Sequence, residues 1–159
     1  MNKLLFLCTG NYYRSRFSEI YFAHLARQHN LRWEADSCGL ALDPRNTGPL
    51  SHFTIDECNR MKLAIDMQRF PRPLTLEDLE RSHRVIAVKE AEHRPLMQRL
   101  FPEWADRIDY WHVHDIDFET PDVALPQLRT HVEALIDELR QEAEMSEETS
   151  GQDSVASSR

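Results

Sequence analysis

Residues 4–15, with the sequence LLFLCTGNYYRS, decide the fold of this chain because they pass from an apolar strand through a polar loop into a helix. A strand, a short loop and a helix N-terminus present backbone N–H groups and the positive end of the helix dipole to one point, which suits a phosphate-sized anion. Cys8 ends the predicted strand, and Arg14 stands at the predicted helix start. We expect the N–H groups of residues 9–14 to face a bound phosphate, with Cys8 below it and Arg14 donating two parallel hydrogen bonds to it.

The same loop is expected to make Cys8 reactive. The helix dipole, the loop amides and Arg14 all favour the thiolate, which is the nucleophilic form of cysteine. Ser15 can donate its hydroxyl to the sulfur, Gly10 suits a tight or left-handed turn, and Asn11 can hold the loop through side-chain hydrogen bonds. A thiolate inside a phosphate site predicts phosphoryl transfer through a phosphocysteine.

Strands and helices alternate along the rest of the chain. Apolar patterns predict strands at residues 3–8, 32–37, 85–88 and 108–111, and helices at 15–29, 90–100 and 124–143. A capping-box pattern at residues 54–57 lies within or at the start of another helix, and residues 75–78, after Pro71 and Pro73, suggest a further helix start. This order predicts an α/β fold, a four-stranded parallel sheet doubly wound with helices on both faces, with its chemistry at the carboxyl edge of the strands.

Composition limits the class of protein. The chain has 159 residues, a formal net charge of −8 and 41% hydrophobic residues, which fits one folded domain over residues 1–143. Residues 144–159 offer no apolar face and are predicted to form a disordered acidic tail. The net charge argues against a nucleic-acid partner, and no apolar run is long enough for a membrane span. Without a signal-peptide pattern or a disulfide framework, a cytoplasmic location is expected.

Residues 8–15, CTGNYYRS, are similar to the Cys-x-Gly-Asn-x-Cys-Arg-Ser-Pro loop of the low-molecular-weight protein tyrosine phosphatase family. Residues 36–39, 83–88 and 111–115 resemble further segments of that family, so the likeness covers about residues 1–140. It implies that residues 1–143 are a phosphatase domain, a cysteine-dependent protein tyrosine phosphatase acting on a phosphorylated protein or a small phosphomonoester without a cofactor. It also implies phosphate-binding positions at Thr9, Gly10, Asn11, Tyr12, Tyr13 and Ser15.

The general acid of the family corresponds to Asp115, by its distance from Trp111. Such an acid protonates the leaving oxygen and later activates water. Ile116 stands where the family has proline, and Asp117 where it has an aromatic residue. Asp117 is therefore a second candidate for the acid.

Two other functions stay open at this stage. An arsenate-reductase-like oxyanion reductase would need a cysteine relay, for which only Cys38 and Cys58 remain. A phosphate-recognising module without turnover is the other, because the acid loop departs from the family pattern. His112, His114 and Asp115 form a weak metal-ligand pattern, and we predict no metal site there.

Overall fold

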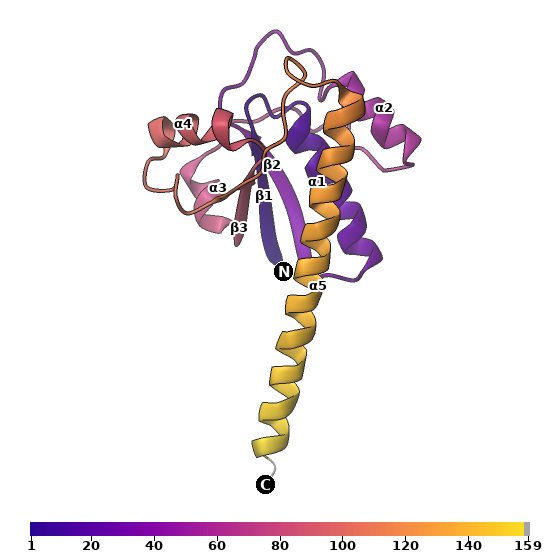
Figure 1. The fold of residues 1–159 in the computed structure, drawn as a ribbon, viewed down its shortest axis with the longest axis vertical. Coiled ribbons are helices and arrows are strands. Elements are labelled where there is room, and N and C mark those ends of the chain that lie inside the picture. The colour runs from indigo at the N-terminus through magenta and orange to yellow at the C-terminus, as the bar shows by residue number, and fades with distance from the viewer. Residues whose placement is uncertain (158–159) are drawn as a thin grey trace.

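The computed structural model, which describes residues 1–157, has the predicted α/β fold (Figure 1). Its sheet has the order β2-β1-β3-β4, and every pair of neighbouring strands is parallel. The strands are β1 (Asn2–Cys8), β2 (Trp33–Gly39), β3 (Arg84–Ala87) and β4 (Asp109–Tyr110). The helices are α1 (Arg14–Gln28), α2 (His52–Arg60), α3 (Leu76–Arg81), α4 (Glu90–Leu100) and α5 (Pro121–Ser157).

Strand β1 lies in the interior of the sheet because it is apolar on both faces. Leu4 and Phe6 belong to a core shared with α1, α2 and α5, whereas Leu5 and Leu7 belong to a second core with α3 and α4. Figure 1 shows the two helix layers on opposite sides of the strands. The carboxyl ends of the parallel strands therefore meet at one edge, where Cys8 ends β1 beside Gly39 of β2.

The helix starts follow local capping chemistry. The Thr75 hydroxyl accepts from the Asp78 backbone N–H, and the Asp78 carboxylate accepts from the Thr75 N–H, so a capping box forms at the helix start predicted there. Ser51, not Thr54, caps α2, and Thr54 lies inside that helix and donates to the Tyr13 carbonyl at 3.1 Å. Helix α1 follows Tyr13, which makes no side-chain cap bond.

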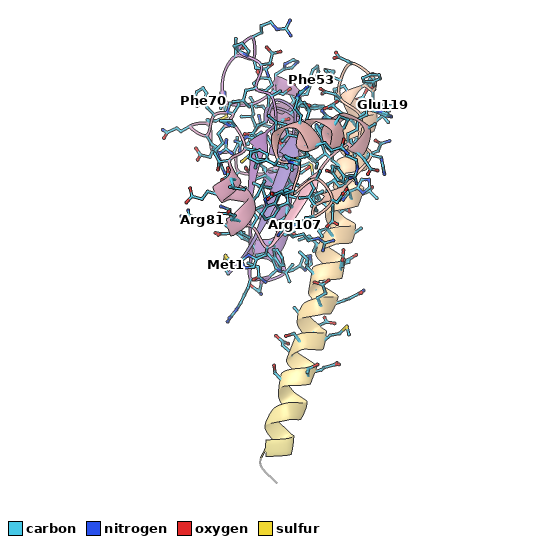
Figure 2. The ribbon with its side chains drawn as sticks, turned by 90° about the vertical axis from the view of Figure 1, so that its left-hand side faces the viewer. Met1, Phe53, Phe70, Arg81, Arg107 and Glu119 are labelled. Atoms are coloured by element: carbon cyan, nitrogen blue, oxygen red, sulfur yellow. The ribbon has the colours of Figure 1, made fainter. Side chains whose placement is uncertain are left out.

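The C-terminal segment differs from the sequence-based expectation of disorder from residue 144. Helix α5 continues to Ser157 and extends away from the domain (Figure 1 and Figure 2), although its last buried residue is Leu139 and residues 140–151 are exposed. The absence of an apolar face predicts that a segment does not pack, but backbone hydrogen bonding can still extend an existing helix without renewed nucleation. The division at residue 143 into domain and tail stays a prediction. Within residues 1–157, neither α5 nor any other helix has the length and apolar character of a membrane span.

Candidate active site

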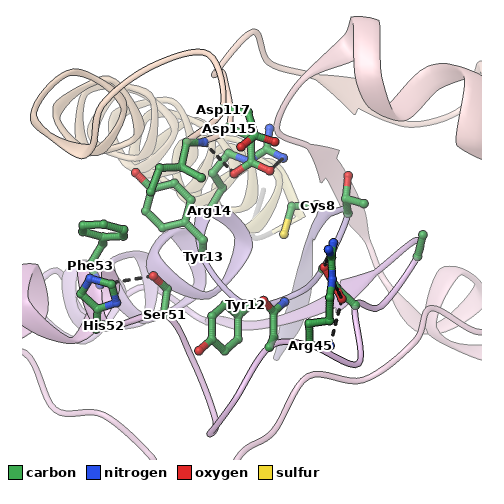
Figure 3. Close-up of a pocket in the computed structure, with 16 residues that line it drawn as sticks. Cys8, Tyr12, Tyr13, Arg14, Arg45, Ser51, His52, Phe53, Asp115 and Asp117 are labelled. Atoms are coloured by element: carbon green, nitrogen blue, oxygen red, sulfur yellow. Dashed lines mark hydrogen bonds and ion pairs between the residues drawn. The ribbon is translucent and has the colours of Figure 1, made fainter.

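A pocket of about 380 Å³ opens at the carboxyl edge of the sheet, above the end of β1 (Figure 3). Its floor is the β1–α1 loop. Its walls come from residues 41–46 after β2, from residues 51–53 at the start of α2, and from residues 115–117 after β4. The pocket thus joins the loop and the acid segment that the sequence analysis singled out, although they lie about a hundred residues apart in the chain.

Cys8 lies at the base of this pocket with only 3% of its surface exposed. Its Sγ atom is 2.9 Å from the Ser15 Oγ atom. The Asn11 side chain donates to the same Ser15 oxygen at 3.0 Å. A thiolate cannot donate, so with Cys8 in that form the Ser15 hydroxyl would be the donor to the sulfur, which is the role that the sequence analysis expects of it.

Asn11 holds the loop in a strained backbone conformation. Its φ of 50° is in the left-handed region, and its side chain is fully buried. Besides Ser15, its amide donates to Ser37 Oγ at 2.8 Å, and its carbonyl oxygen accepts from the Arg72 backbone N–H at 3.1 Å and from Arg69 at 3.2 Å. These partners come from β2 and the segment before α3, and the sequence did not identify them.

Three carbonyls of the β1–α1 loop accept hydrogen bonds from the surrounding protein. Thr9 O accepts from the Ala41 N–H, Tyr12 O from the Ser51 N–H and Tyr13 O from the Phe17 N–H. The N–H groups of residues 9–13, in contrast, donate to no other described residue. A loop that pairs several of its carbonyls with the protein and leaves its N–H groups unpaired is suited to bind an anion.

Arg14 is 1% exposed and lines the pocket. Its Nη1 donates to the Val113 carbonyl at 3.0 Å, and its Nη2 lies 2.6 Å from Glu92 Oε2 and 3.4 Å from Asp115 Oδ2. Its Nε–H has no partner among the described residues. A buried guanidinium with an unpaired N–H is poised to donate to a further acceptor, such as a phosphate oxygen.

Glu92 and His93, in the first turn of α4, are site residues that the sequence analysis missed. Burial by itself raises the pKa of Glu92, but the hydrogen bond from His93 and the charge of Arg14 outweigh it and hold that pKa far below its usual range. Burial, together with the charge of Arg14, lowers the pKa of His93, which is fully buried. The signal available in the sequence was an acidic residue in a helix that begins directly after β3, at the edge that carries Cys8.

Asp115 and Asp117, the two candidate general acids, differ in burial and in their contacts at the pocket. Asp115 is partly buried and close to Arg14, and its Oδ1 accepts from the Ile116 backbone N–H at 2.9 Å. Asp117 lines the same pocket but is exposed. Figure 3 shows both carboxylates on the side of the pocket that holds Arg14. Because Asp115 is the one oriented by neighbouring groups, it is better suited to deliver a proton at a defined point.

Tyrosines 12 and 13 both line the pocket, as does Phe53. The Tyr12 hydroxyl donates to the Thr47 carbonyl, which ties the Tyr12 ring to the loop after β2. The Tyr13 ring packs edge-on against Phe53 with centroids 6.3 Å apart, and burial raises its pKa to about 12. These rings give the pocket an aromatic wall beside the phosphate loop.

The remaining cysteines are buried and poorly suited as nucleophiles for a relay with Cys8. Cys38 belongs to the core on the opposite face of the sheet from Cys8, and Cys58 is fully buried in α2. Burial raises the thiol pKa of each to about 12, so both are overwhelmingly protonated near neutral pH. Within the described residues, no group of three ligating side chains could hold a metal ion, and His112 and His114 are exposed.

Comparison with known proteins agrees with this geometry. The model of the family described as low molecular weight phosphotyrosine protein phosphatase matches residues 3–150. A comparison with curated protein sequences finds no significant match.

Several solved structures share the fold. The low molecular weight protein tyrosine phosphatase of T. tengcongensis is 24% identical, with a TM-score of 0.72, and the match covers 89% of this chain and 99% of that one. VcLMWPTP-2 of Vibrio cholerae O395 is 16% identical, with a TM-score of 0.77 and the same coverage of 89% and 99%. The YwlE arginine phosphatase of Geobacillus stearothermophilus is 20% identical, with a TM-score of 0.70 and coverage of 89% and 95%. The family match spans most of the chain and includes the whole β1–α1 loop, so this protein belongs to the low molecular weight phosphotyrosine protein phosphatase family.

Proposed function

We propose that this protein hydrolyses phosphotyrosine in proteins through a phosphocysteine on Cys8. The observation that carries the proposal is the convergence of three unpaired or poised groups in one pocket. These are the Cys8 sulfur beside Ser15, the unpartnered N–H groups of residues 9–13 and the unpartnered Arg14 Nε–H. Together they supply a nucleophile and donors for the phosphate oxygens.

The reaction has two steps. The Cys8 thiolate attacks phosphorus, the bond from phosphorus to the ester oxygen breaks, and Asp115 gives its proton to the departing oxygen. Asp115, now a carboxylate, then takes a proton from water, whose oxygen attacks phosphorus while the sulfur–phosphorus bond breaks. The products are the free hydroxyl compound and inorganic phosphate, and the thiolate is regenerated. Arg14 and the loop N–H groups stabilise the charge that develops on the phosphate oxygens in both steps.

The aromatic wall of Tyr12, Tyr13 and Phe53 supports phosphotyrosine as the substrate, because a phenyl ring can stack or pack edge-on against it. The acidic net charge makes nucleic acid an unsuitable partner. We also propose a cytoplasmic location, since an essential thiolate needs a reducing compartment.

The test is hydrolysis of p-nitrophenyl phosphate and a phosphotyrosyl peptide by the native protein and by Cys8→Ser, with a strong chelator present. A phosphoarginine peptide serves as the comparison substrate, because a structural neighbour is named as an arginine phosphatase. We expect hydrolysis by the native protein, faster on the phosphotyrosyl peptide, and none by Cys8→Ser. Tight phosphopeptide binding without phosphate release would instead identify a recognition module, and full activity of Cys8→Ser would exclude Cys8 as the nucleophile.

A further inference from the structure

We propose that Glu92, held by His93, is a positioning residue that keeps the Arg14 guanidinium in its working orientation. The inference deepens the proposed function and rests on it. It starts from an unusual concentration of hydrogen bonds on a single atom. Glu92 Oε2 accepts from Arg14 Nη2 at 2.6 Å and from the Thr9 hydroxyl at 2.5 Å, and it lies 2.8 Å from His93 Nε2.

His93 is oriented by the backbone. Its Nδ1 accepts from the Lys89 N–H at 3.1 Å, so a neutral His93 carries its proton on Nε2, the nitrogen that faces Glu92 and Thr9. The ring is fully buried and therefore has one available arrangement. The chain of contacts runs from the Lys89 backbone through His93 and Glu92 to Arg14.

Two of the three guanidinium nitrogens of Arg14 are held by the protein, and the third is not. Val113 and Glu92 hold Nη1 and Nη2, which fixes the plane of the guanidinium. The Nε–H is buried and has no hydrogen-bond partner among the described residues, and in this proposal it is the donor that meets the substrate. A planar guanidinium that is fixed at two nitrogens presents its remaining donor with a defined direction, which transition-state stabilisation requires.

Glu92 also affects Asp115, because both carboxylates face Arg14 Nη2. Without Glu92, Asp115 would be the remaining carboxylate partner of Arg14 in the described structure. The guanidinium would then be held by Asp115 and the Val113 carbonyl, and its orientation toward the substrate would be less well defined. Glu92 thus keeps Arg14 from depending on Asp115 for its position.

We expect Glu92→Gln to change kcat differently from KM and from the inhibition constant of inorganic phosphate. A neutral amide holds Arg14 less firmly, so kcat should fall by about tenfold or more. Removing a negative charge from the phosphate site should leave the KM and the inhibition constant of inorganic phosphate unchanged or lower. A residue that only maintained the loop would raise both constants when altered.

The matched control is Glu90→Gln. Glu90 lies in the same first turn of α4, but its side chain pairs with Arg94, whereas that of Glu92 pairs with Arg14. We expect its kinetics to stay within about twofold of the native protein.

Two variants of His93 test whether its Nε2–H donor, and not only the volume of its ring, is needed to hold Glu92. Gln at position 93 can place a donor where Nε2 stands, whereas Asn can reach only the position of Nδ1. We expect His93→Gln to keep most of kcat and His93→Asn to approach Glu92→Gln. If Glu92→Gln does not fold, the comparison of the two His93 variants still tests whether the contact between His93 and Glu92 positions Arg14.

The experiment is steady-state kinetics on p-nitrophenyl phosphate, with inorganic phosphate as inhibitor, for the native protein and the four variants. Glu92→Gln with native kcat, or with a reduced kcat and weaker phosphate inhibition, would overturn the inference. So would a His93→Asn variant as active as His93→Gln. Absence of hydrolysis by the native protein would instead refute the proposed function, and the two failures are therefore distinguishable.

Discussion

The Ser15 hydroxyl oxygen lies 2.9 Å from the Cys8 sulfur and simultaneously accepts a hydrogen bond from Asn11. The bond from Asn11 holds the Ser15 oxygen beside the sulfur, so the Ser15 hydroxyl can donate to Cys8 when Cys8 is a thiolate. A hydrogen bond from a neutral donor to a charged acceptor is stronger than one between neutral groups. This link joins the loop geometry to the reactivity of Cys8.

Ser15→Ala should therefore lower kcat by about tenfold, the value of one hydrogen bond to a charged group. Steady-state kinetics on p-nitrophenyl phosphate measures the change. Ser18→Ala is the matched control, because Ser18 is also buried in α1 but donates to the Arg14 backbone carbonyl. Equal kcat values in the two variants would contradict the assigned role of Ser15.

Asn11 should show two separable contributions to stability. Asn11→Ala loses the side-chain hydrogen bonds and places an alanine at a φ of 50°, so we expect the free energy of unfolding to fall by roughly 2–4 kcal/mol. Asn11→Gly loses the same hydrogen bonds without the backbone strain and should be about 1 kcal/mol more stable than Asn11→Ala. Urea denaturation measures both values. If the two variants are equally stable, the left-handed conformation is not an energetic factor.

The acid can be identified by the dependence of rate on the leaving group. Asp115→Asn should lose about a hundredfold in kcat on phenyl phosphate, whose leaving group needs a proton, and much less on p-nitrophenyl phosphate. Asp117→Asn should change both rates by less than about threefold, because that side chain is exposed. A larger loss for Asp117→Asn on phenyl phosphate would reverse the assignment.

Asp36 gives the domain an acid-sensitive contribution to stability. Burial raises its pKa, but the Ser37 backbone N–H and Arg72, which lies 2.6 Å away, outweigh this effect, so the pKa in the folded protein is lowered. A lowered folded-state pKa stabilises the protein fully above the ordinary carboxyl pKa of about 3.9, and this stability is lost as pH falls through the folded value.

Asp36→Asn should therefore destabilise the protein by about 1–3 kcal/mol at pH 7 and by less at acidic pH. Denaturant unfolding at a series of pH values measures the difference. Asp43→Asn is the control, because the Asp43–Arg45 pair is exposed and should matter little to stability. A difference between native and Asp36→Asn protein that does not shrink in acid would count against the ionic contribution.

The sequence by itself was sufficient for the β1–α1 loop and for the alternation of parallel strands and helices along the chain, but not for the order of the strands in the sheet. Cys8, Asn11, Arg14 and Ser15 lie within one turn of loop and helix, so their mutual placement depends on local backbone geometry that the residue types reveal. The alternation of apolar strands and amphipathic helices likewise determines the layers, because each apolar face must be covered.

Only the tertiary structure decided which distant groups complete the site. Ser37, Arg69 and Arg72 reach Asn11 from β2 and the segment before α3, and Glu92 with His93 reaches Arg14 from α4. Polar residues of these kinds are common in any sequence, and no local pattern distinguishes those that fold against the loop. Their contacts arise because the parallel strands bring their carboxyl ends to one edge, so side chains far apart in sequence meet around one buried anion site.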